Sequence, residues 1–305
     1  MSKLPLSVVI NTRNSENTLA KALESVSDIA TQIIVMDMKS EDKTEQIAKK
    51  YTKDVFTTTK DYEYVEPARN AALAKADQEW ILILDADEEL SLGLKKEIEE
   101  ILVRPKTDAE CFFLPRKNII FGKEMEGTGW WPDYQMRLFK KGKVEWSDKI
   151  HSIPKIDGKV EHLPADLSKA ILHHNFQKVD QFVTRLNRYT SIESLSEEQK
   201  NELSPASALA LFTDEFLRRM FAQKGIDEGI HGVSLSLLHS SYQLISFLKH
   251  WEKQGFSATT GDQEATLLQL EKFESELNYW IADWKVNHSS GFSKIIWQIR
   301  RKLKW

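Results

Sequence analysis

The fold is decided by Trp80-Ile81-Leu82-Ile83-Leu84, an apolar run that passes directly into Asp85-Ala86-Asp87-Glu88-Glu89. A strand with one face in water alternates apolar and polar residues, whereas a strand covered on both faces is apolar throughout. This run has no polar position, so we expect a central strand of a parallel sheet with helices on both faces. The acidic residues that follow mark the end of that strand.

The same pattern extends outward from this strand. Short apolar runs predict further strands at residues 6–10, 33–36, 54–56, 111–121 and 134–139. Segments with helical periodicity lie between the first of these strands. In one segment, Leu19, Leu23 and Val26 lie on a single face of the predicted helix. Strands that alternate with helices build a mostly parallel sheet with covering helices, so the sequence predicts a Rossmann-like α/β architecture.

The pattern changes near residue 179, after which long helical segments with few glycines follow one another. We therefore predict two domains. An α/β domain occupies residues 1–175, and an α-helical C-terminal region occupies residues 176–305.

The composition is that of an ordinary globular protein. Lys and Arg number 42 against 46 Asp and Glu, a net charge of −4, so the strongly basic surface of a nucleic-acid-binding protein is not expected. The single cysteine, Cys111, excludes an intramolecular disulfide and a cysteine-rich zinc module. A secretory leader and a membrane-spanning apolar run are both absent from the sequence pattern, so we expect a cytoplasmic protein.

Polar side chains follow three of the predicted strands. Asn11 to Asn14 follow the first, Asp37 the second, and Asp85 and Asp87 the central one. Because open α/β sheets bind ligands beyond the carboxyl ends of their strands, these residues predict one binding crevice. The two carboxylates of Asp85 and Asp87 lie on the same side of an extended segment and can hold a divalent cation through oxygen. The alternative is that they cap the helix that follows.

Arg69 opens another predicted helix, which Pro67 begins. Its planar guanidinium matches the oxygens of a phosphate group. The alternative is a surface ion pair with Glu66.

These motifs resemble those of the family 2 glycosyltransferases, which have the GT-A fold and transfer sugars from nucleotide donors with inversion. The resemblance rests on residues 6–14, 34–44, 65–70 and 80–88, in the family's order and spacing. Further similarity at residues 136–139, His151, 224–230 and 249–252 points to the branch that includes the lipopolysaccharide inner-core β-glucosyltransferases. The resemblance thus covers residues 4–255.

The resemblance also implies roles for individual residues. It places the donor nucleotide at Thr12, Asn14, Asp37, Arg69 and Asp85. It places a divalent cation, Mg²⁺ or Mn²⁺, at Asp85 and Asp87, with His151 as a further contact. Many members of the branch have Glu after this histidine, whereas this chain has Ser152. The cation neutralises charge on the departing nucleoside diphosphate.

Inverting transfer needs a base that removes the proton of the acceptor hydroxyl. Asp133 is our candidate, because it lies in the loop before the last predicted strand, on the acceptor side of the crevice. An Asp after Pro is also a common turn residue, and Glu88 and Glu89 are competing bases. The adjacent His173-His174 would point to opposite faces of a strand, so we expect a structural role for them.

Residues 291–305 predict a basic amphipathic helix. The basic residues are Lys294, Arg300, Arg301, Lys302 and Lys304, and the apolar stripe is Phe292, Ile295, Ile296, Ile299 and Leu303. Together with Trp297 and Trp305, this favours contact with an anionic cytoplasmic leaflet. Arg218-Arg219 and the half-apolar residues 233–248 favour the same interpretation. The alternative is a terminal helix that packs its apolar stripe on the core.

We therefore expect an inverting, metal-dependent glycosyltransferase, peripheral on the inner face of the cell membrane. By resemblance, it would move a sugar, glucose first, from a UDP-sugar to an envelope glycolipid such as lipopolysaccharide core. A protein acceptor stays open, because the donor half would look the same. An inactive nucleotide-sugar-binding adaptor stays open because of Ser152. A nucleotidyltransferase is disfavoured, because residues 11–15 contain no glycine to cradle a triphosphate.

Overall fold

The computed structural model describes residues 3–60, 66–103, 108–146, 154–194, 203–257 and 263–304. The chain divides into two compact units. The sheet unit contains residues 1–120 and 131–175, and the helical unit contains residues 121–130 and 176–305. The loop at residues 121–130 therefore belongs to the helical unit, although the sheet unit flanks it in sequence.

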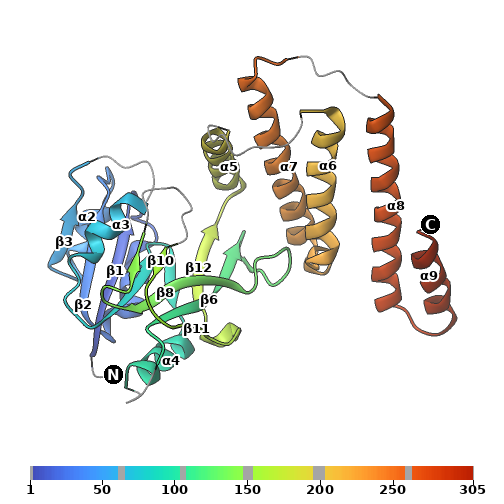
Figure 1. Cartoon of the computed structure of the whole chain (residues 1–305). Coiled ribbons are helices and arrows are strands. Elements are labelled where there is room, and N and C mark those ends of the chain that lie inside the picture. The colour runs from blue at the N-terminus through green and yellow to red at the C-terminus, as the bar shows by residue number, and fades with distance from the viewer. Residues whose placement is uncertain are drawn as a thin grey trace. The chain divides into compact units, whose positions relative to one another are not determined.

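A large mixed sheet forms the frame of the sheet unit, with strand order β3-β2-β1-β4-β8-β6-β12-β5 (Figure 1). The parallel half consists of β3 (Asp54–Thr57), β2 (Ala30–Asp37), β1 (Leu4–Thr12) and β4 (Trp80–Asp85). Beyond it, β8 runs antiparallel to β4 and β6 antiparallel to β8, and β5 runs antiparallel to β12. These strands are β8 (Asp133–Lys140), β6 (Cys111–Ile120), β12 (Ile171–Phe176) and β5 (Glu88–Leu90).

Short elements complete the sheet unit. β11 (Val160–His162) runs parallel to the start of β6. β9 (Val144–Glu145) pairs with β10 (Lys155–Ile156) in a separate ribbon, and the 3-10 turn η1 (Leu167–Lys169) precedes β12.

Both faces of the central strands are covered, which explains the apolar run of β4. On one face, Val8 and Leu82 belong to a core with α1 (Leu19–Ser27), α2 (Thr44–Ala48) and α4 (Leu92–Val103). On the other face, Val9 and Ile83 belong to a core with α3 (Glu66–Leu73). Because successive residues of β4 enter opposite cores, the strand accepts its first polar residue only at its end.

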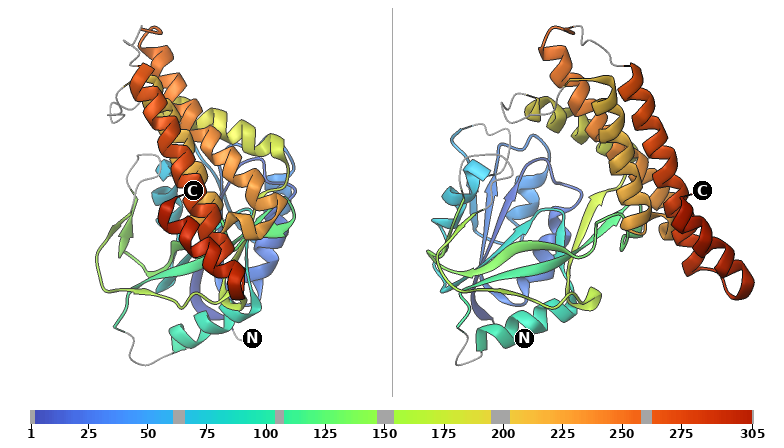
Figure 2. Two further views of the ribbon diagram at one scale, coloured as in Figure 1. Left: turned by 90° about the vertical axis from the view of Figure 1, so that its right-hand side faces the viewer. Right: turned by 45° about the vertical axis from the view of Figure 1, so that its right-hand side comes forward.

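Helices make up most of the helical unit. These are α5 (Val179–Glu193), α6 (Pro205–Leu217), α7 (Ile230–Lys253), α8 (Gln263–Asn287) and α9 (Gly291–Leu303). The π-helical turn η2 (Arg218–Ala222) extends α6, the 3-10 turn η3 (Gly225–Glu228) precedes α7, and β7 (Lys123–Glu124) lies in the loop at residues 121–130. Helices α6, α7 and α8 lie side by side, and α9 returns along α8 (Figures 1 and 2).

Small residues allow α7 to pack closely within the helical unit. A Cβ atom on Gly232 would lie 1.8 Å from the carbonyl oxygen of Gly225. The buried hydroxyls of Ser236 and Ser240 each donate to a carbonyl oxygen one turn earlier, at 2.7 Å. These two serines of the half-apolar helix thus serve internal packing. None of the described helices is both long and apolar enough to span a bilayer.

The predicted α/β architecture and the helical C-terminal region are confirmed. The predicted strands correspond to β1, β2, β3, β4, β6 and β8. Strand β5 was not predicted from the sequence. Glu88 and Glu89 come just after β4, and glutamate pairs are not typical of strands. They form one nonetheless, since β12 pairs with them from a distant part of the chain.

We expect Leu82→Ala to lower the free energy of unfolding by about 2–5 kcal/mol, because it removes buried methyl groups and leaves a cavity. Leu82 is fully buried in β4. Urea denaturation followed by circular dichroism measures the loss. Leu92→Ala is the matched control, because Leu92 is 73% exposed and the change there should stay within about 0.5 kcal/mol. Equal losses in the two variants would contradict the packing of β4.

Candidate active site

The strand register brings three of the predicted site residues to one edge of the sheet. Thr12, at the end of β1, lies opposite Asp37 at the end of β2. Asn11 lies opposite Asp85 at the end of β4. Neighbouring parallel strands thus present polar residues at their carboxyl ends, which is where open α/β sheets bind ligands.

Hydrogen bonds join the loops that follow β1 and β2. Ser40 donates to Asp37 Oδ1 from its backbone N–H, at 3.1 Å, and from its hydroxyl, at 2.5 Å. The Ser40 hydroxyl oxygen in turn accepts from the backbone N–H of Asn14 at 2.9 Å, and Asn14 Oδ1 accepts from the N–H of Glu41 at 2.9 Å. Asn14 has φ 50°, a left-handed conformation that Asn adopts more readily than most residues. Asn14 therefore shapes the loop beside Asp37.

Two polar atoms at this edge lack a hydrogen-bond partner within the described part of the chain. They are the Thr12 Oγ1 and Asn11 Nδ2 atoms, and both are buried. Most buried polar groups are paired, and one that is not costs about 1–3 kcal/mol. The edge between Asp37 and Asp85 is therefore a place where a polar ligand or a water molecule would complete the pairing.

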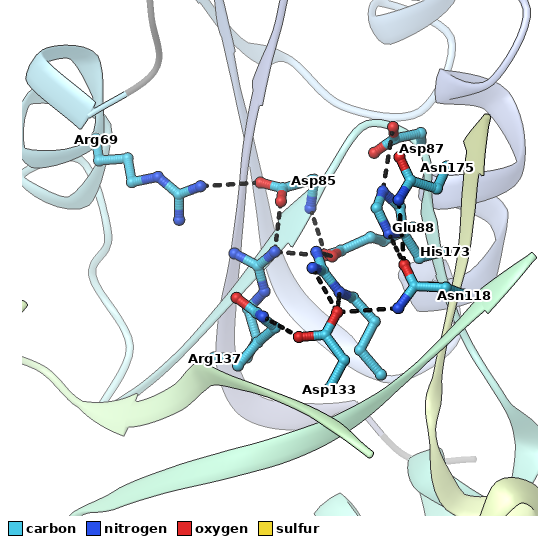
Figure 3. Close-up of polar contacts among 11 residues, drawn as sticks. Arg69, Asp85, Asp87, Glu88, Asn118, Asp133, Arg137, His173 and Asn175 are labelled. Atoms are coloured by element: carbon cyan, nitrogen blue, oxygen red, sulfur yellow. Dashed lines mark hydrogen bonds and ion pairs between the residues drawn. The ribbon is translucent and has the colours of Figure 1, made fainter. Parts of the chain in front are cut away.

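Asp85 is held between two arginines that come from different elements (Figure 3). Arg69 of α3 donates to Oδ1 at 3.1 Å, and Arg137 of β8 donates to Oδ2. Burial alone would raise the pKa of Asp85, but the charges of Arg137, Arg69 and Arg116 outweigh it and hold the pKa well below its ordinary value. Asp85 is therefore an ionised carboxylate whose charge the protein itself compensates.

A fully buried carboxylate, that of Glu88, lies next to Asp85. Arg137 and Arg116 donate to Oε1 of Glu88 at 2.7 and 2.9 Å, and the backbone N–H of Asp85 donates to Oε2 at 2.9 Å. Burying an ionised carboxylate costs several kcal/mol unless charges and hydrogen bonds compensate it. Here both oxygens are compensated, and Arg137 links Glu88 to Asp85. Complete burial also keeps Glu88, one of the competing bases, away from any substrate.

Asp133, the predicted base, begins β8 and lies opposite Arg116 of β6 in the sheet. Arg116 donates to Oδ2 through Nε at 2.8 Å and through a terminal nitrogen at 2.7 Å. Asn118 donates to the same oxygen at 2.9 Å, and Gln135 donates to Oδ1 at 2.6 Å. Burial would raise the pKa of Asp133, but the Arg116 charge and these donors lower it. The carboxylate is thus held ionised and oriented (Figure 3).

Asp87 lies at the outer side of this network, with its side chain 29% exposed. Its Oδ2 lies 3.5 Å from Nε2 of His173, and Nδ1 of His173 lies 2.7 Å from Oδ1 of Asn118. Because Asn118 also donates to Asp133, a chain of polar contacts runs from Asp87 through His173 and Asn118 to Asp133 (Figure 3).

His174 makes a separate contact. Its Nε2 lies 2.7 Å from Oε1 of Glu89, whose side chain is 24% exposed. The two histidines therefore bind different carboxylates, as expected for neighbours on one strand. Glu89 is partly exposed, unlike Glu88.

The described residues contain no group of three or more His, Cys, Asp and Glu side chains that could hold a metal ion. Asp85 already binds two guanidinium groups, whereas Asp87 contacts His173, and the side chains of both carboxylates are 29% exposed. His151 and Ser152 lie outside the described residues. Mg²⁺ commonly needs only one or two protein carboxylates when phosphate oxygens supply the remainder, so Asp87 fits a cation that arrives with a diphosphate.

No role was predicted from sequence for Arg116, Asn118 or Arg137. A signal for two of them was present, because Arg116 follows the apolar run Cys111 to Pro115 and Arg137 lies between Met136 and Leu138. A charged residue in a buried strand almost always has a partner of opposite charge. Arg137, which is buried, and Arg116, whose side chain is 15% exposed, therefore indicate that the acidic cluster and these strands meet.

We expect Arg137→Met to lower the free energy of unfolding by about 3–5 kcal/mol, because it leaves Glu88 with a buried charge that lacks one of its partners. Arg137→Lys should cost less, since it keeps the charge and loses the planar fork. Arg218→Met is the matched control, because Arg218 is 47% exposed in its ion pair with Glu215 and such a pair contributes about 0–1 kcal/mol. Urea denaturation compares the three, and a small loss for Arg137→Met would count against the network.

The lowered pKa of Asp133 gives a pH-dependent prediction. A carboxyl group with a lowered folded-state pKa stabilises the protein above its unfolded pKa of about 3.9, and this contribution is lost as pH falls through the folded pKa. The difference in unfolding free energy between wild type and Asp133→Asn should therefore be constant from neutral pH to about pH 5 and shrink below about pH 4. Denaturant titrations across this range measure it. A difference that does not change with pH would show that Arg116 does not hold Asp133 ionised.

Comparisons with known proteins identify the reaction class. The family model described as Glycosyl transferase family 2 matches residues 7–154. An uncharacterized glycosyltransferase of Rickettsia conorii is 25% identical over 258 residues, which cover 80% of this chain and 89% of that protein. One of Rickettsia typhi is 28% identical over 194 residues, which cover 61% of this chain and 65% of that protein.

A further relative carries a more specific name. The lipopolysaccharide core biosynthesis glycosyltransferase LpsC of Rhizobium meliloti is 23% identical over 275 residues, which cover 86% of this chain and 98% of that protein. Among solved structures, S. aureus TarS 1–349 in complex with UDP-GlcNAc is similar with a TM-score of 0.44 and 15% identity, over 97% of this chain and 90% of that chain. The sequence matches confirm the family that the motifs resemble. The comparisons thus support a glycosyltransferase, and residues 7–154 match the family 2 model.

Proposed function

We propose that this glycosyltransferase moves a sugar from a nucleoside diphosphate sugar, with UDP-glucose as the first donor to test, to a hydroxyl of an envelope glycolipid at the cytoplasmic face of the membrane. The proposed donor site is supported by the strand register, which sets Thr12, Asp37 and Asp85 side by side at the edge formed by the carboxyl ends of the parallel strands. The name of the LpsC relative favours lipopolysaccharide core as the acceptor.

In this proposal the nucleoside binds beside Asp37 and the diphosphate beside Arg69. The hydrogen bonds from Ser40 go to Oδ1 of Asp37 and orient its carboxylate, which is suited to accept from ribose hydroxyl or base N–H groups. Arg69 is itself oriented by Asp85 and brings a positive charge toward the phosphate oxygens. Asn14 holds the loop that would close over the nucleoside.

Asp87 is the residue that would hold a divalent cation, with the diphosphate supplying further oxygen ligands. Such a cation would neutralise charge on the departing nucleoside diphosphate. Asp85 would act on the same group less directly, because it orients Arg69. His173 would keep the Asp87 carboxylate in place through its contact with Oδ2.

The acceptor hydroxyl must lose its proton as it attacks the sugar from the face opposite the diphosphate. Asp133 is our proposed base, and it is ionised as a base must be, although Arg116, Asn118 and Gln135 all oppose its protonation. Glu89 is the competing base, because it is partly exposed and its side chain contacts His174 rather than a guanidinium group.

UDP-glucose with Mn²⁺ is expected to raise the melting temperature of the wild type, since a ligand at one hundred times its Kd stabilises by about 2.7 kcal/mol. Asp87→Asn should remove the part of this shift that depends on Mn²⁺, and EDTA should do the same to the wild type. Asp157→Asn is the matched control, because Asp157 lies in the same unit with its side chain 85% exposed. A cation-dependent shift that survives in Asp87→Asn would exclude Asp87 as the ligand.

The two candidate bases give different kinetic results. Loss of a general base lowers kcat by about 10²–10⁴-fold, so Asp133→Asn should show this loss of UDP release in the presence of acceptor while it keeps the donor-induced thermal shift. Glu89→Gln should retain most of the activity. The reverse result would move the base to Glu89. Donor binding without any UDP release by the wild type would instead indicate an inactive adaptor.

A further inference from the structure

The C-terminal helix α9 exposes its apolar stripe. Phe292, Ile295, Ile296, Ile299 and Leu303 are between 43% and 77% exposed. At about 100° per residue, these side chains fall within about 100° of one another around the helix axis. A terminal helix that packed its stripe on the core, the alternative considered from sequence, would bury these residues instead.

The opposite side of α9 packs on α8. Arg301 donates to Asp283 of α8 at 2.8 Å, and Lys285 of α8 lies over the Trp297 ring at 5.8 Å. Trp297 and Arg301 are the two half-buried residues of α9, and they lie about 140–180° from the centre of the apolar stripe. Helix α9 lies beside α8 (Figures 1 and 2). Its contacts with α8 come from Arg301 and Trp297, so the apolar stripe faces away from α8.

Positive charge flanks the stripe on both sides. Arg300 and Lys302 lie about 80° to either side of its centre. Residues 291–305 contain five Lys and Arg and no Asp or Glu, in a chain of net charge −4. Arg300 also lies over the Trp297 ring, at 5.1 Å. An apolar stripe between rows of cations is the arrangement that matches acyl chains below anionic headgroups.

Other features of the helical unit that suggested a membrane serve its internal structure. Arg218 and Arg219 both pair with Glu215, and Arg219 also donates to the carbonyl oxygen of Thr128 at 2.6 Å. Ser236 and Ser240 of α7 donate to carbonyl oxygens of their own helix. Among the described residues, α9 is therefore the element that favours contact with a membrane surface.

We propose that α9 docks the protein on an anionic lipid bilayer, with its apolar stripe at the boundary between headgroups and acyl chains. A second copy of the chain would be a poorer partner, because a symmetric contact would bring the same five cations to face each other. Docking of α9 on a membrane is a separate property from donor binding and does not depend on the proposed donor site. Its consequence is that the catalytic unit stays at the surface where a glycolipid acceptor would be found.

Vesicle flotation of the full-length protein, without donor, tests this proposal. Vesicles of equal parts phosphatidylglycerol and phosphatidylcholine should carry the wild type upward, and vesicles of phosphatidylcholine alone should carry much less. Ile295→Glu combined with Ile299→Glu should lower the bound fraction at least about tenfold, because two charges replace the centre of the stripe. Arg300→Gln combined with Lys302→Gln should weaken binding to the anionic vesicles, as should about 0.5 M salt.

Leu267→Glu combined with Leu268→Glu is the matched control. These leucines of α8 are 60% and 58% exposed, so the change in charge and in exposed apolar surface is similar. This variant should float as the wild type does, and the melting temperatures of all variants should be equal, because no substituted side chain is buried. Equal flotation of the α9 variants and the wild type would overturn the proposal. So would a dimer, seen by analytical ultracentrifugation, that the Ile295→Glu and Ile299→Glu changes dissociate. The donor-induced thermal shift is measured separately, so failure of docking and failure of the proposed donor site are distinguishable.

Discussion

The buried charge of Glu88 is the constraint on which the rest of the site depends. A carboxylate with no exposed surface is tolerated only if cations and hydrogen-bond donors surround it. Arg116 and Arg137 both donate to Glu88 and meet that requirement. Arg137 also binds Asp85, and Arg116 also binds Asp133. The same two guanidinium groups thus make the burial of Glu88 possible and fix the carboxylates of Asp85 and Asp133.

The two halves of the sheet contribute different charged groups to the site. The parallel half ends in acceptors, at Asp37 and Asp85, while the antiparallel strands β6 and β8 supply the cations Arg116 and Arg137. An acidic edge with no cations near it would repel the diphosphate of a donor, whereas a compensated edge admits it. The ion pairs also leave Asp87 as the less constrained carboxylate, which is consistent with its proposed role toward a cation.

The sequence predicts those parts of the fold and site that depend on local pattern. The apolar run of β4 and its acidic end are such parts, because burial on both faces and the end of a strand each leave a mark in consecutive residues. Arg116 and Asp133 come together through the pairing of β6 with β8, which contains a register shift between Phe112 and Phe113. No pattern in one strand fixes such a register. The sequence can therefore indicate that Arg116 and Arg137 meet the acidic residues, but not which carboxylate each arginine binds. The amphipathic character of α9 was likewise predictable, but the side that faces α8 depends on Asp283, in a different helix.

We propose that the donor binds at the carboxyl ends of β1, β2 and β4. A crystal structure of the protein soaked to saturation with UDP-glucose and Mn²⁺ would locate it. We expect a nucleotide beside Asp37, with its diphosphate near Arg69 and Asp87, while Arg137 still joins Asp85 to Glu88. A nucleotide bound at any other surface, with this edge of the sheet unchanged, would contradict it.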